Sequence, residues 1–382
     1  METLNDTGAS ETPVPSSRRS QALADTRIPQ SAVGAALAQG SSLRVRDDSP
    51  PDACERYVAN HPLACAYHRP GWLALIGRAF GHETKYLVAE SEGEVAGVLP
   101  LVLFRSSLFG RFAVSIPFLN YGGLLADTEE AERALLNRAI AETERIGGTH
   151  LELRHTRQIF SELSSKRHKV AMRLGLAATV DEQWQRLDRK LRNQVRKGEK
   201  SGLSVAVGGA QLLDPFYTVF ARNMRDLGTP VYNVRFFREV LSTFADSARV
   251  VAVTLEGRPV AASIVHWHGG TMEVPWASAI REFNPFCANV LLYWHMLRLA
   301  IERGLGTFDF GRSTPGEGTF LFKRQWDAEP TELVWEYWMA HGRPLPDLSP
   351  KNPKFSLAIR VWQQLPVRVT TTIGPMIVRN IP

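Results

Sequence analysis

One order of predicted elements occurs twice along this chain, and that repeat limits the possible folds more than any other feature. Residues 86–104 (YLVAESEGEVAGVLPLVLF) place a Glu-Gly turn between two apolar runs, which predicts a hairpin of buried strands. Residues 249–268 (RVVAVTLEGRPVAASIVHWH) repeat that pattern. Residues 131–154 and 289–311 then each continue with a helical period, a glycine stop and a strand. The matching order favours a duplication, and chance similarity among short strand motifs is the alternative.

The sequence therefore predicts an α/β protein made of two halves, residues 51–165 and residues 202–345. Residues 1–50 are rich in Ser, Thr, Ala, Pro and Asp without a sustained period, which predicts a disordered leader. Residues 166–201 are expected to connect the halves through a strand and a basic helix. Residues 346–382 are expected to form a C-terminal tail that is both cationic and apolar.

The connecting segment contains a well-defined helical signal at residues 179–200 (TVDEQWQRLDRKLRNQVRKGEK). Thr179 and Glu182 fit a capping box, and an apolar stripe follows at helical spacing, so one amphipathic helix is predicted. Its exposed face is strongly cationic. Because guanidinium groups match phosphate oxygens bidentately, Arg192 and Arg196 are candidates for binding a phosphorylated ligand or RNA. A solvated surface helix is the alternative.

Composition excludes several classes of protein. The 382 residues carry a formal net charge of +6, which is compatible with an anionic partner. Cys54, Cys65 and Cys287 have neither disulfide-framework nor zinc-site spacing, and His266 with His268 lacks a nearby third ligand, so no metal site is expected. No apolar run is long enough to span a bilayer, and the N-terminus does not resemble a signal peptide, so a cytoplasmic location is expected.

A glycine-rich loop follows a short strand in residues 308–326 (FDFGRSTPGEGTFLFKRQW). Gly311 and Gly316 have the spacing of a phosphate-binding P-loop, but Glu317 occupies the position of the required lysine. A nucleotide triphosphatase is therefore not expected. The Arg/Gln-x-x-Gly-x-Gly turn that holds the pyrophosphate of coenzyme A is also not found, which argues against a coenzyme A enzyme.

Two residues in this segment are the candidate catalytic groups. Asp309 lies on the strand face opposite Phe308 and Phe310, where it could act as a general base or orient an amine, or simply cap the loop. Lys323 lies among aromatic residues that would desolvate its ammonium and strengthen its hold on a phosphate or an oxyanion, the alternative being a surface lysine. The same segment supplies four candidate substrate-binding residues: Arg312, Ser313, Thr314 and Arg324.

Further candidates for the same cleft come from two other segments. Trp276, Asn289 and Tyr293 lie around a turn that leads into a helix beginning near Asn289, with core or capping roles as the alternative. Asp226 and Tyr232 lie in a segment predicted to be a loop before a helix, where a substrate contact is plausible.

Together these segments resemble the FemAB family, and most of all the FemAB-like proteins associated with PEP-CTERM/exosortase systems. The resemblance rests on LRNQVRKGEKSG, PWASAIREFNPFCANVLLYW and FDFGRSTPGEGTFLFKRQWDAEP, and it covers roughly residues 50 to 370. It implies two tandem GNAT-like (acyl-CoA N-acyltransferase-like) domains, the second of them BioF2-like. The Phe-Lys-x-x-aromatic motif implies a substrate-handling lysine at Lys323. No segment supplies the long helical arm that FemAB enzymes often carry.

The resemblance implies an acyltransferase that transfers an acyl or aminoacyl group to an amine. No bound cofactor is expected, and the donor would be aminoacyl-tRNA or acyl-CoA. The acceptor would be a phosphorylated or lipid-linked envelope precursor, or an exopolysaccharide-related one. The alternatives are a coenzyme A-dependent acetyltransferase and an inert module that binds a glycan or a partner. For the tail, packing across the two halves is favoured over peripheral contact with the inner membrane.

Overall fold

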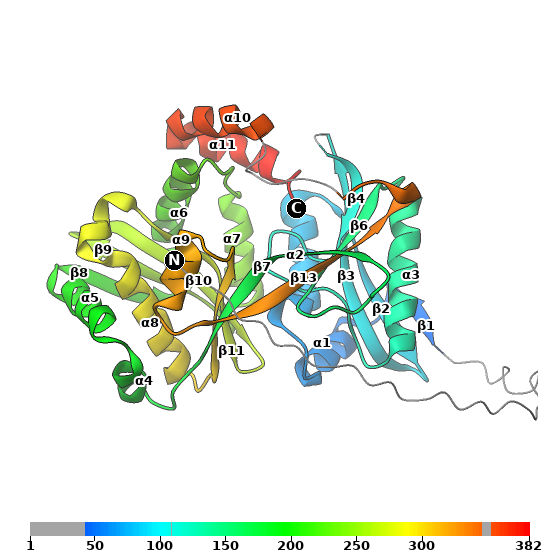
Figure 1. Cartoon of the computed structure of the whole chain (residues 1–382), viewed down its shortest axis with the longest axis horizontal. Coiled ribbons are helices and arrows are strands. Elements are labelled where there is room, and N and C mark those ends of the chain that lie inside the picture. The colour runs from blue at the N-terminus through cyan, green and yellow to red at the C-terminus, as the bar shows by residue number, and fades with distance from the viewer. Residues whose placement is uncertain (1–42, 108, 346–352) are drawn as a thin grey trace, which may run out of the picture. The chain divides into compact units, whose positions relative to one another are not determined.

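A computed structural model describes residues 43–107, 109–345 and 353–382, and residues 42–382 form one compact unit (Figure 1). The predicted leader lies mostly outside the described residues. Its last part was predicted wrongly, because Arg44–Arg46 form strand β1, which pairs with the edge of the sheet. No helix in the described part of the chain is long and apolar enough to cross a bilayer.

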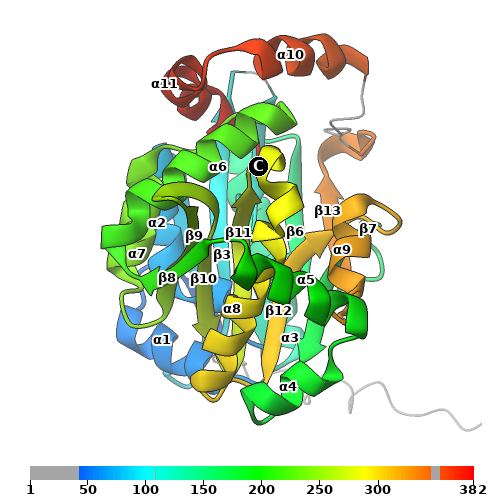
Figure 2. The ribbon, with the colours of Figure 1, turned by 90° about the vertical axis from the view of Figure 1, so that its left-hand side faces the viewer.

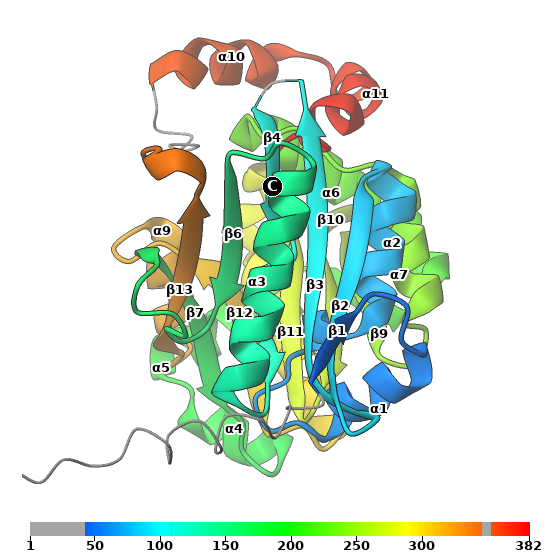
Figure 3. The same cartoon turned by 90° about the vertical axis from the view of Figure 1, so that its right-hand side faces the viewer.

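The first predicted half contains the expected hairpin, helix and strand. The hairpin is β2 with β3, the helix is α3, and the following strand is β6. Figure 3 shows α3 lying across the strands of this half. Its helices and strands are α1 (Pro51–Asn60), α2 (Pro70–Phe80), β2 (Glu83–Ser91), β3 (Glu94–Ser106), β4 (Gly110–Val114), β5 (Leu125–Ala126), α3 (Glu129–Arg145) and β6 (His150–His155).

The second half repeats this order with β9, β10, α8 and β12, as predicted. Figure 2 shows α8 and α5 on the face of this half turned to the viewer. The elements from the connecting segment onward are β7 (Ser164–Gly175), α4 (Val180–Arg186), α5 (Arg189–Lys200), β8 (Leu203–Gly208), α6 (Leu213–Leu227), α7 (Val234–Thr243), β9 (Ala248–Leu255), β10 (Arg258–His268), β11 (Thr271–Ala279), α8 (Ala288–Glu302), β12 (Thr307–Ser313), α9 (Gly318–Arg324) and β13 (Glu329–Met339).

All these strands belong to one mixed sheet, in the order β1-β2-β3-β4-β6-β13-β7-β12-β11-β10-β9-β8, with β5 paired to β3. The halves are therefore parts of a single compact unit. Strand β13 joins them, because it pairs with β6 of the first half and with β7, which in turn pairs with β12. One hydrophobic core, formed by α2, α6 and α7 against the sheet, also extends through both halves. The predicted boundaries at residues 165 and 202 stay predictions.

The predicted single helix at residues 179–200 is wrong in one respect, because two helices form there. The Thr179 hydroxyl caps α4 as expected by accepting a hydrogen bond from the backbone N–H of Glu182. The chain is extended at Leu187 and Asp188, and the Asp188 carboxylate caps α5 by accepting from the N–H of Leu191 at 2.6 Å. Asp188, a second capping residue within the apolar stripe, thus divides the predicted helix into α4 and α5.

The C-terminal tail forms two helices, α10 (Pro353–Gln364) and α11 (Val367–Val378), which lie at one end of the molecule (Figures 1 and 2). Both helices contact α6 of the second half. The last residues also reach the first half, where a ring nitrogen of His82 lies 2.7 Å from the carbonyl oxygen of Arg379. The tail thus packs across the two halves, as favoured from the sequence.

Candidate active site

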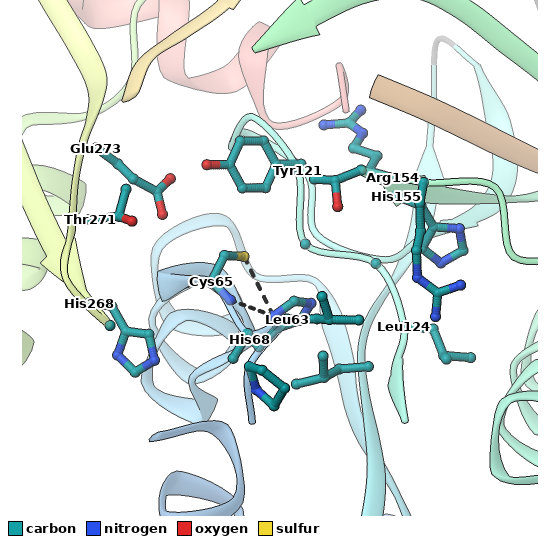
Figure 4. A pocket seen from close by; sticks show the side chains of 18 of the residues that line it. Leu63, Cys65, His68, Tyr121, Leu124, Arg154, His155, His268, Thr271 and Glu273 are labelled. Atoms are coloured by element: carbon teal, nitrogen blue, oxygen red, sulfur yellow. Dashed lines mark hydrogen bonds between the residues drawn. The ribbon is translucent and has the colours of Figure 1, made fainter. Parts of the chain in front are cut away.

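A cavity of about 370 Å³ opens between the two halves (Figure 4). Its walls come from residues 62–68 and 121–126, from the end of β6, and from the first residues of β11 and β12. Figure 4 shows Glu273 on one side of this cavity and His155 on the other. Both halves of the chain therefore contribute to a single site.

The strand register explains why charged side chains gather beside this cavity. Strands β11 and β12 run parallel, but they pair only from Thr271–Thr307 to Glu273–Asp309. On its other side, β12 runs antiparallel to β7, and this places Asp309 opposite Arg173. The register thus sets Glu273, Asp309 and Arg173 in one row across three neighbouring strands.

Asp309 is fully buried and has three hydrogen-bond partners. Its carboxylate accepts from the Tyr121 hydroxyl at 2.7 Å, from the backbone N–H of Gly311 at 2.7 Å and from Nε of Arg173 at 3.1 Å. Gly311 has φ of +78°, a conformation that favours glycine. Asp309 therefore holds Tyr121 and Arg173 in place. Its predicted role, as a general base or as the group that orients an amine, stays a prediction.

Glu273 has the opposite properties. Its side chain is buried and lines the cavity, and its Oε2 atom makes no hydrogen bond with the described residues, although the Tyr67 and Tyr121 hydroxyls lie near the carboxyl and lower its pKa in part. Burial, and then the negative charge of Asp309 beside it, raise the pKa of the Glu273 carboxyl to about 8. The neighbouring cation, Arg173, is already bonded to Asp309. Glu273 is the group in this row that can take up and release a proton near neutral pH.

Lys323 lies behind β12, on helix α9. The glycine-rich loop before it ends at α9, which begins at Gly318. The Lys323 ammonium donates to the carbonyl oxygens of Gly311 at 2.9 Å and Arg312 at 3.0 Å, and burial lowers its pKa to about 8. The expected desolvation is confirmed. An ammonium has three N–H donors, so one remains after these two hydrogen bonds.

A histidine and a carboxylate form a second buried pair at the opposite wall. The Nδ1 atom of His155 lies 2.6 Å from Oε2 of Glu336, whose carboxylate also accepts from the backbone N–H groups of Ile159 and Phe160. Nε2 of His155 has no hydrogen-bond partner among the described residues. Gly123 packs directly on this ring, since a Cβ atom there would lie 2.0 Å from Cδ2 of His155. The pair fixes the ring at the wall of the cavity.

Some of the other predicted site residues also lie around β12. The Arg312 guanidinium stacks over the Trp335 ring at 5.1 Å, and burial lowers its pKa to about 10. Ser313 is buried, and the Thr314 hydroxyl accepts a hydrogen bond from Lys169 at 2.6 Å. Asp309, Arg312 and Lys323 therefore come together around Gly311.

The remaining predicted residues lie elsewhere. Trp276 and Tyr293 are buried in two hydrophobic cores, in agreement with their alternative role in packing. Asp226 lies in the last turn of α6 and pairs with Arg225, so the loop predicted there begins only at Gly228. Tyr232 packs among Phe80, Phe118 and Phe236, Asn289 lies half-exposed in the first turn of α8, and Arg324 pairs with Glu329. On α5, Arg192 is half-buried and donates to Gln185, and exposed Arg196 stacks over the Trp184 ring.

Sequence reasoning missed Glu273, Arg173, Tyr121 and His155. Glu273 left a readable signal, because TMEVPWASA has one carboxylate within a buried apolar strand, and an acid there needs a partner or a function. Arg173 similarly follows an apolar stretch of β7. Their meeting depends on the register of three strands that lie far apart in the sequence, so no local pattern could reveal it.

Comparison with known proteins identifies the type of domain that supplies part of this site. Residues 185–324 match the family model described as the acetyltransferase (GNAT) domain, and this range includes Glu273, Asp309 and Lys323. The predicted enzyme class, an acyltransferase, is confirmed by this match. No protein with a curated function matches the chain.

Several solved structures share the fold at low sequence identity. FemX is similar with a TM-score of 0.62 and 14% identity, covering 83% of this chain and 100% of the FemX chain. L-PGS from Bacillus licheniformis is similar with a TM-score of 0.51 and 11% identity, covering 83% and 98%. A tandem GNAT protein from the clavulanic acid biosynthesis pathway has a TM-score of 0.50 and 14% identity, covering 80% and 100%. The predicted fold class is confirmed, and the likeness to FemX agrees with a FemAB-like fold.

Proposed function

We propose that this chain transfers an acyl or aminoacyl group to an amine, and that Glu273 is the general base. The observation that carries the proposal is the position of Glu273. It is a buried carboxyl with a pKa raised to about 8, it lines the cavity, and it lies where β11 and β12 separate inside the matched domain. A base titrating near the working pH is effective in proton transfer.

In the proposed reaction the acceptor amine lies in the cavity and its nitrogen attacks the carbonyl carbon of the activated acyl group. The C–N bond forms, and the amine proton passes to the Glu273 carboxylate. The bond from the acyl carbon to the donor then breaks, and the leaving oxygen or sulfur takes up a proton. Asp309 holds Arg173 and Tyr121 beside Glu273. Lys323, with one N–H donor left, supplies positive charge behind β12 for the oxyanion that develops.

The donor and the acceptor are part of this proposal. The resemblance of the sequence to the FemAB family implies aminoacyl-tRNA as the donor, and the likeness of the fold to FemX is in keeping with that choice. Arg192 and Arg196 on the cationic helix α5 would then contact its phosphates. The acceptor we propose is an amine of an envelope or exopolysaccharide precursor in a PEP-CTERM/exosortase context. The tandem GNAT neighbour supports the second candidate, acyl-CoA as donor.

The test is a transfer assay with isotope-labelled aminoacyl-tRNA and acyl-CoA in parallel, with a cell-envelope extract as acceptor and mass spectrometry as the readout. We compare the wild type with Glu273→Gln and with Glu142→Gln, which changes a buried carboxylate on α3. Label should move with the wild type and Glu142→Gln but not with Glu273→Gln. Transfer that persists in Glu273→Gln would overturn the assignment of the base. Tight glycan binding without transfer from either donor would favour the inert module.

A further inference from the structure

The two C-terminal helices have an inner face that is well anchored to the body of the molecule. Nη1 of Arg225 donates to the carbonyl oxygen of Leu365 at 3.2 Å, and Nε2 of Gln363 donates to the carbonyl oxygen of Asp226 at 3.0 Å. Along α11, Thr370, Gly374 and Val378 are buried at a spacing of four residues. This spacing defines the side of α11 that faces the protein.

The outer faces of the same helices are apolar and exposed. On α10, Leu357 is 71% exposed and Val361 is 54% exposed. On α11, Val369, Ile373 and Met376 are exposed at helical spacing, with Met376 at 71%. Half of the large exposed hydrophobic residues of the described chain thus lie on these two short helices, at one end of the molecule (Figure 3). Such a concentration marks a contact surface rather than ordinary surface scatter.

The charge of this segment indicates what the surface contacts. Residues 353–382 contain no Asp or Glu, whereas they contain Lys354, Arg360, Arg368 and Arg379. The three arginines are exposed, and Arg360 and Arg368 directly precede the exposed Val361 and Val369. A long arginine side chain can lie along apolar groups while its guanidinium reaches an anionic layer. Apolar residues flanked only by cations fit a surface with an apolar interior and an anionic rim.

We propose that the outer face of α10 and α11 is a docking surface for an anionic lipid bilayer. The apolar residues Leu357, Val361, Val369, Ile373 and Met376 enter the boundary between headgroups and acyl chains, and the arginines contact lipid phosphates. Both helices lie on the surface of the membrane rather than crossing it, in keeping with their length of 12 residues each. This inference rests on surface composition and does not depend on acyl transfer.

The test is flotation of the full chain with vesicles, comparing phosphatidylglycerol-containing vesicles with pure phosphatidylcholine vesicles at low and high salt. The wild type should float with the anionic vesicles, and less of it should float at high salt, because salt screens the arginines. The double variant Val361→Asp/Val369→Asp should lower the bound fraction about tenfold, since it places two carboxylates at the lipid boundary. The matched control is Val207→Asp, an exposed valine on the edge strand β8, which should float like the wild type.

Circular dichroism and thermal unfolding show whether the variants keep their fold. Equal flotation of the wild type and the double variant, or equal binding to both kinds of vesicle, would overturn the proposal. A wild type that does not float, but forms a dimer that the double variant loses in size-exclusion chromatography, would assign this face to a second copy of the chain instead.

Discussion

The two halves place carboxylates at the same point of their parallel strand pairs, yet the two sites differ in charge. In the first half, β4 and β6 pair at Val114–Glu152, and buried Glu152 bonds Nε of buried Arg154 at 2.7 Å. In the second half, β11 and β12 pair at Glu273–Asp309. Two carboxylates meet there beside one arginine, Arg173, which bonds Asp309.

This difference separates a structural ion pair from a group that can react. The Glu152 carboxylate has an arginine of its own, and this pair holds the strands and the Trp335 ring, over which Arg154 stacks at 4.5 Å. The carboxyl in excess, Glu273, has its pKa raised to about 8 instead. When one copy of a repeated strand pair contains one more buried carboxylate than it has cations, the extra carboxyl can become a proton acceptor.

From the comparison of the two strand pairs, the largest expected effect is a loss of turnover when Glu273 is replaced. Glu273→Gln should lower kcat/KM by about 10²- to 10⁴-fold, because the amide cannot accept the proton of the attacking amine. Steady-state kinetics with the donor that proves active measures this loss. A similar loss in the control Glu142→Gln would show that the effect is not specific to the cavity.

Lys323→Met should lower kcat by about 10²- to 10³-fold, because it removes a preorganised charge that stabilises the transition state. Lys323→Arg keeps the charge but changes its shape, so it should restore only part of the rate. Single-turnover kinetics separates this effect from substrate binding. Turnover unchanged in Lys323→Met would rule out a role for this ammonium in the reaction.

Replacing Glu152 and replacing Glu273 by glutamine should change the free energy of unfolding in opposite directions. Glu152→Gln leaves the buried Arg154 without a counter-ion and should lower the free energy of unfolding by about 3 kcal/mol. Because the Glu273 pKa is raised in the folded state, wild-type stability should fall as pH rises from about 4.5 towards 8. Glu273→Gln cannot ionise, so it should escape this decline and be more stable than the wild type at pH 8. Urea unfolding across this pH range measures the stability of both variants against the wild type. A Glu273→Gln variant less stable than the wild type at pH 8 would contradict the difference drawn here between the two carboxyls.

The smallest expected effect is the pH dependence of kcat/KM, which should follow a bell-shaped profile with its maximum near pH 8. Activity rises as Glu273 loses its proton and falls as Lys323 loses its own, and both pKa values are near 8. Residual activity in Glu273→Gln should lack the rising limb, whereas that in Lys323→Met should lack the falling limb. A profile that is flat between pH 6 and 10 would exclude both assignments.

Much of the fold could be predicted from the sequence, because its signals are local. The two hairpins, helices α3 and α8 and strand β12 follow from turns, periodicity and glycine stops. The break at Asp188 was missed because the apolar stripe continues through it, and β1 was missed because three residues carry little pattern. The pairing of β13 with β6 and β7 joins segments more than 150 residues apart, and nothing local encodes it.

The candidate site was only partly predictable for the same reason. Lys323 and Asp309 lie in one short segment with an unusual composition, so they could be found together. Their partners Glu273, Arg173 and Tyr121 come from three other segments, and tertiary packing decides which carboxylate bonds to Arg173 and which has its pKa raised. The sequence therefore located the segment around Gly311 and left Asp309 open as a base, an orienter of the amine or a loop cap, but it did not indicate Glu273.

The position of strand β13 also affects how the chain is made. The first half cannot cover the outer edge of β6 until residues 329–339 have been synthesised, which is after nearly all of the second half. During translation, β6 therefore has an unpaired edge while residues 156–328 are still being added, and such edges can pair with the wrong strand. Completion of the nascent first half has to wait for the last strand of the sheet to leave the ribosome.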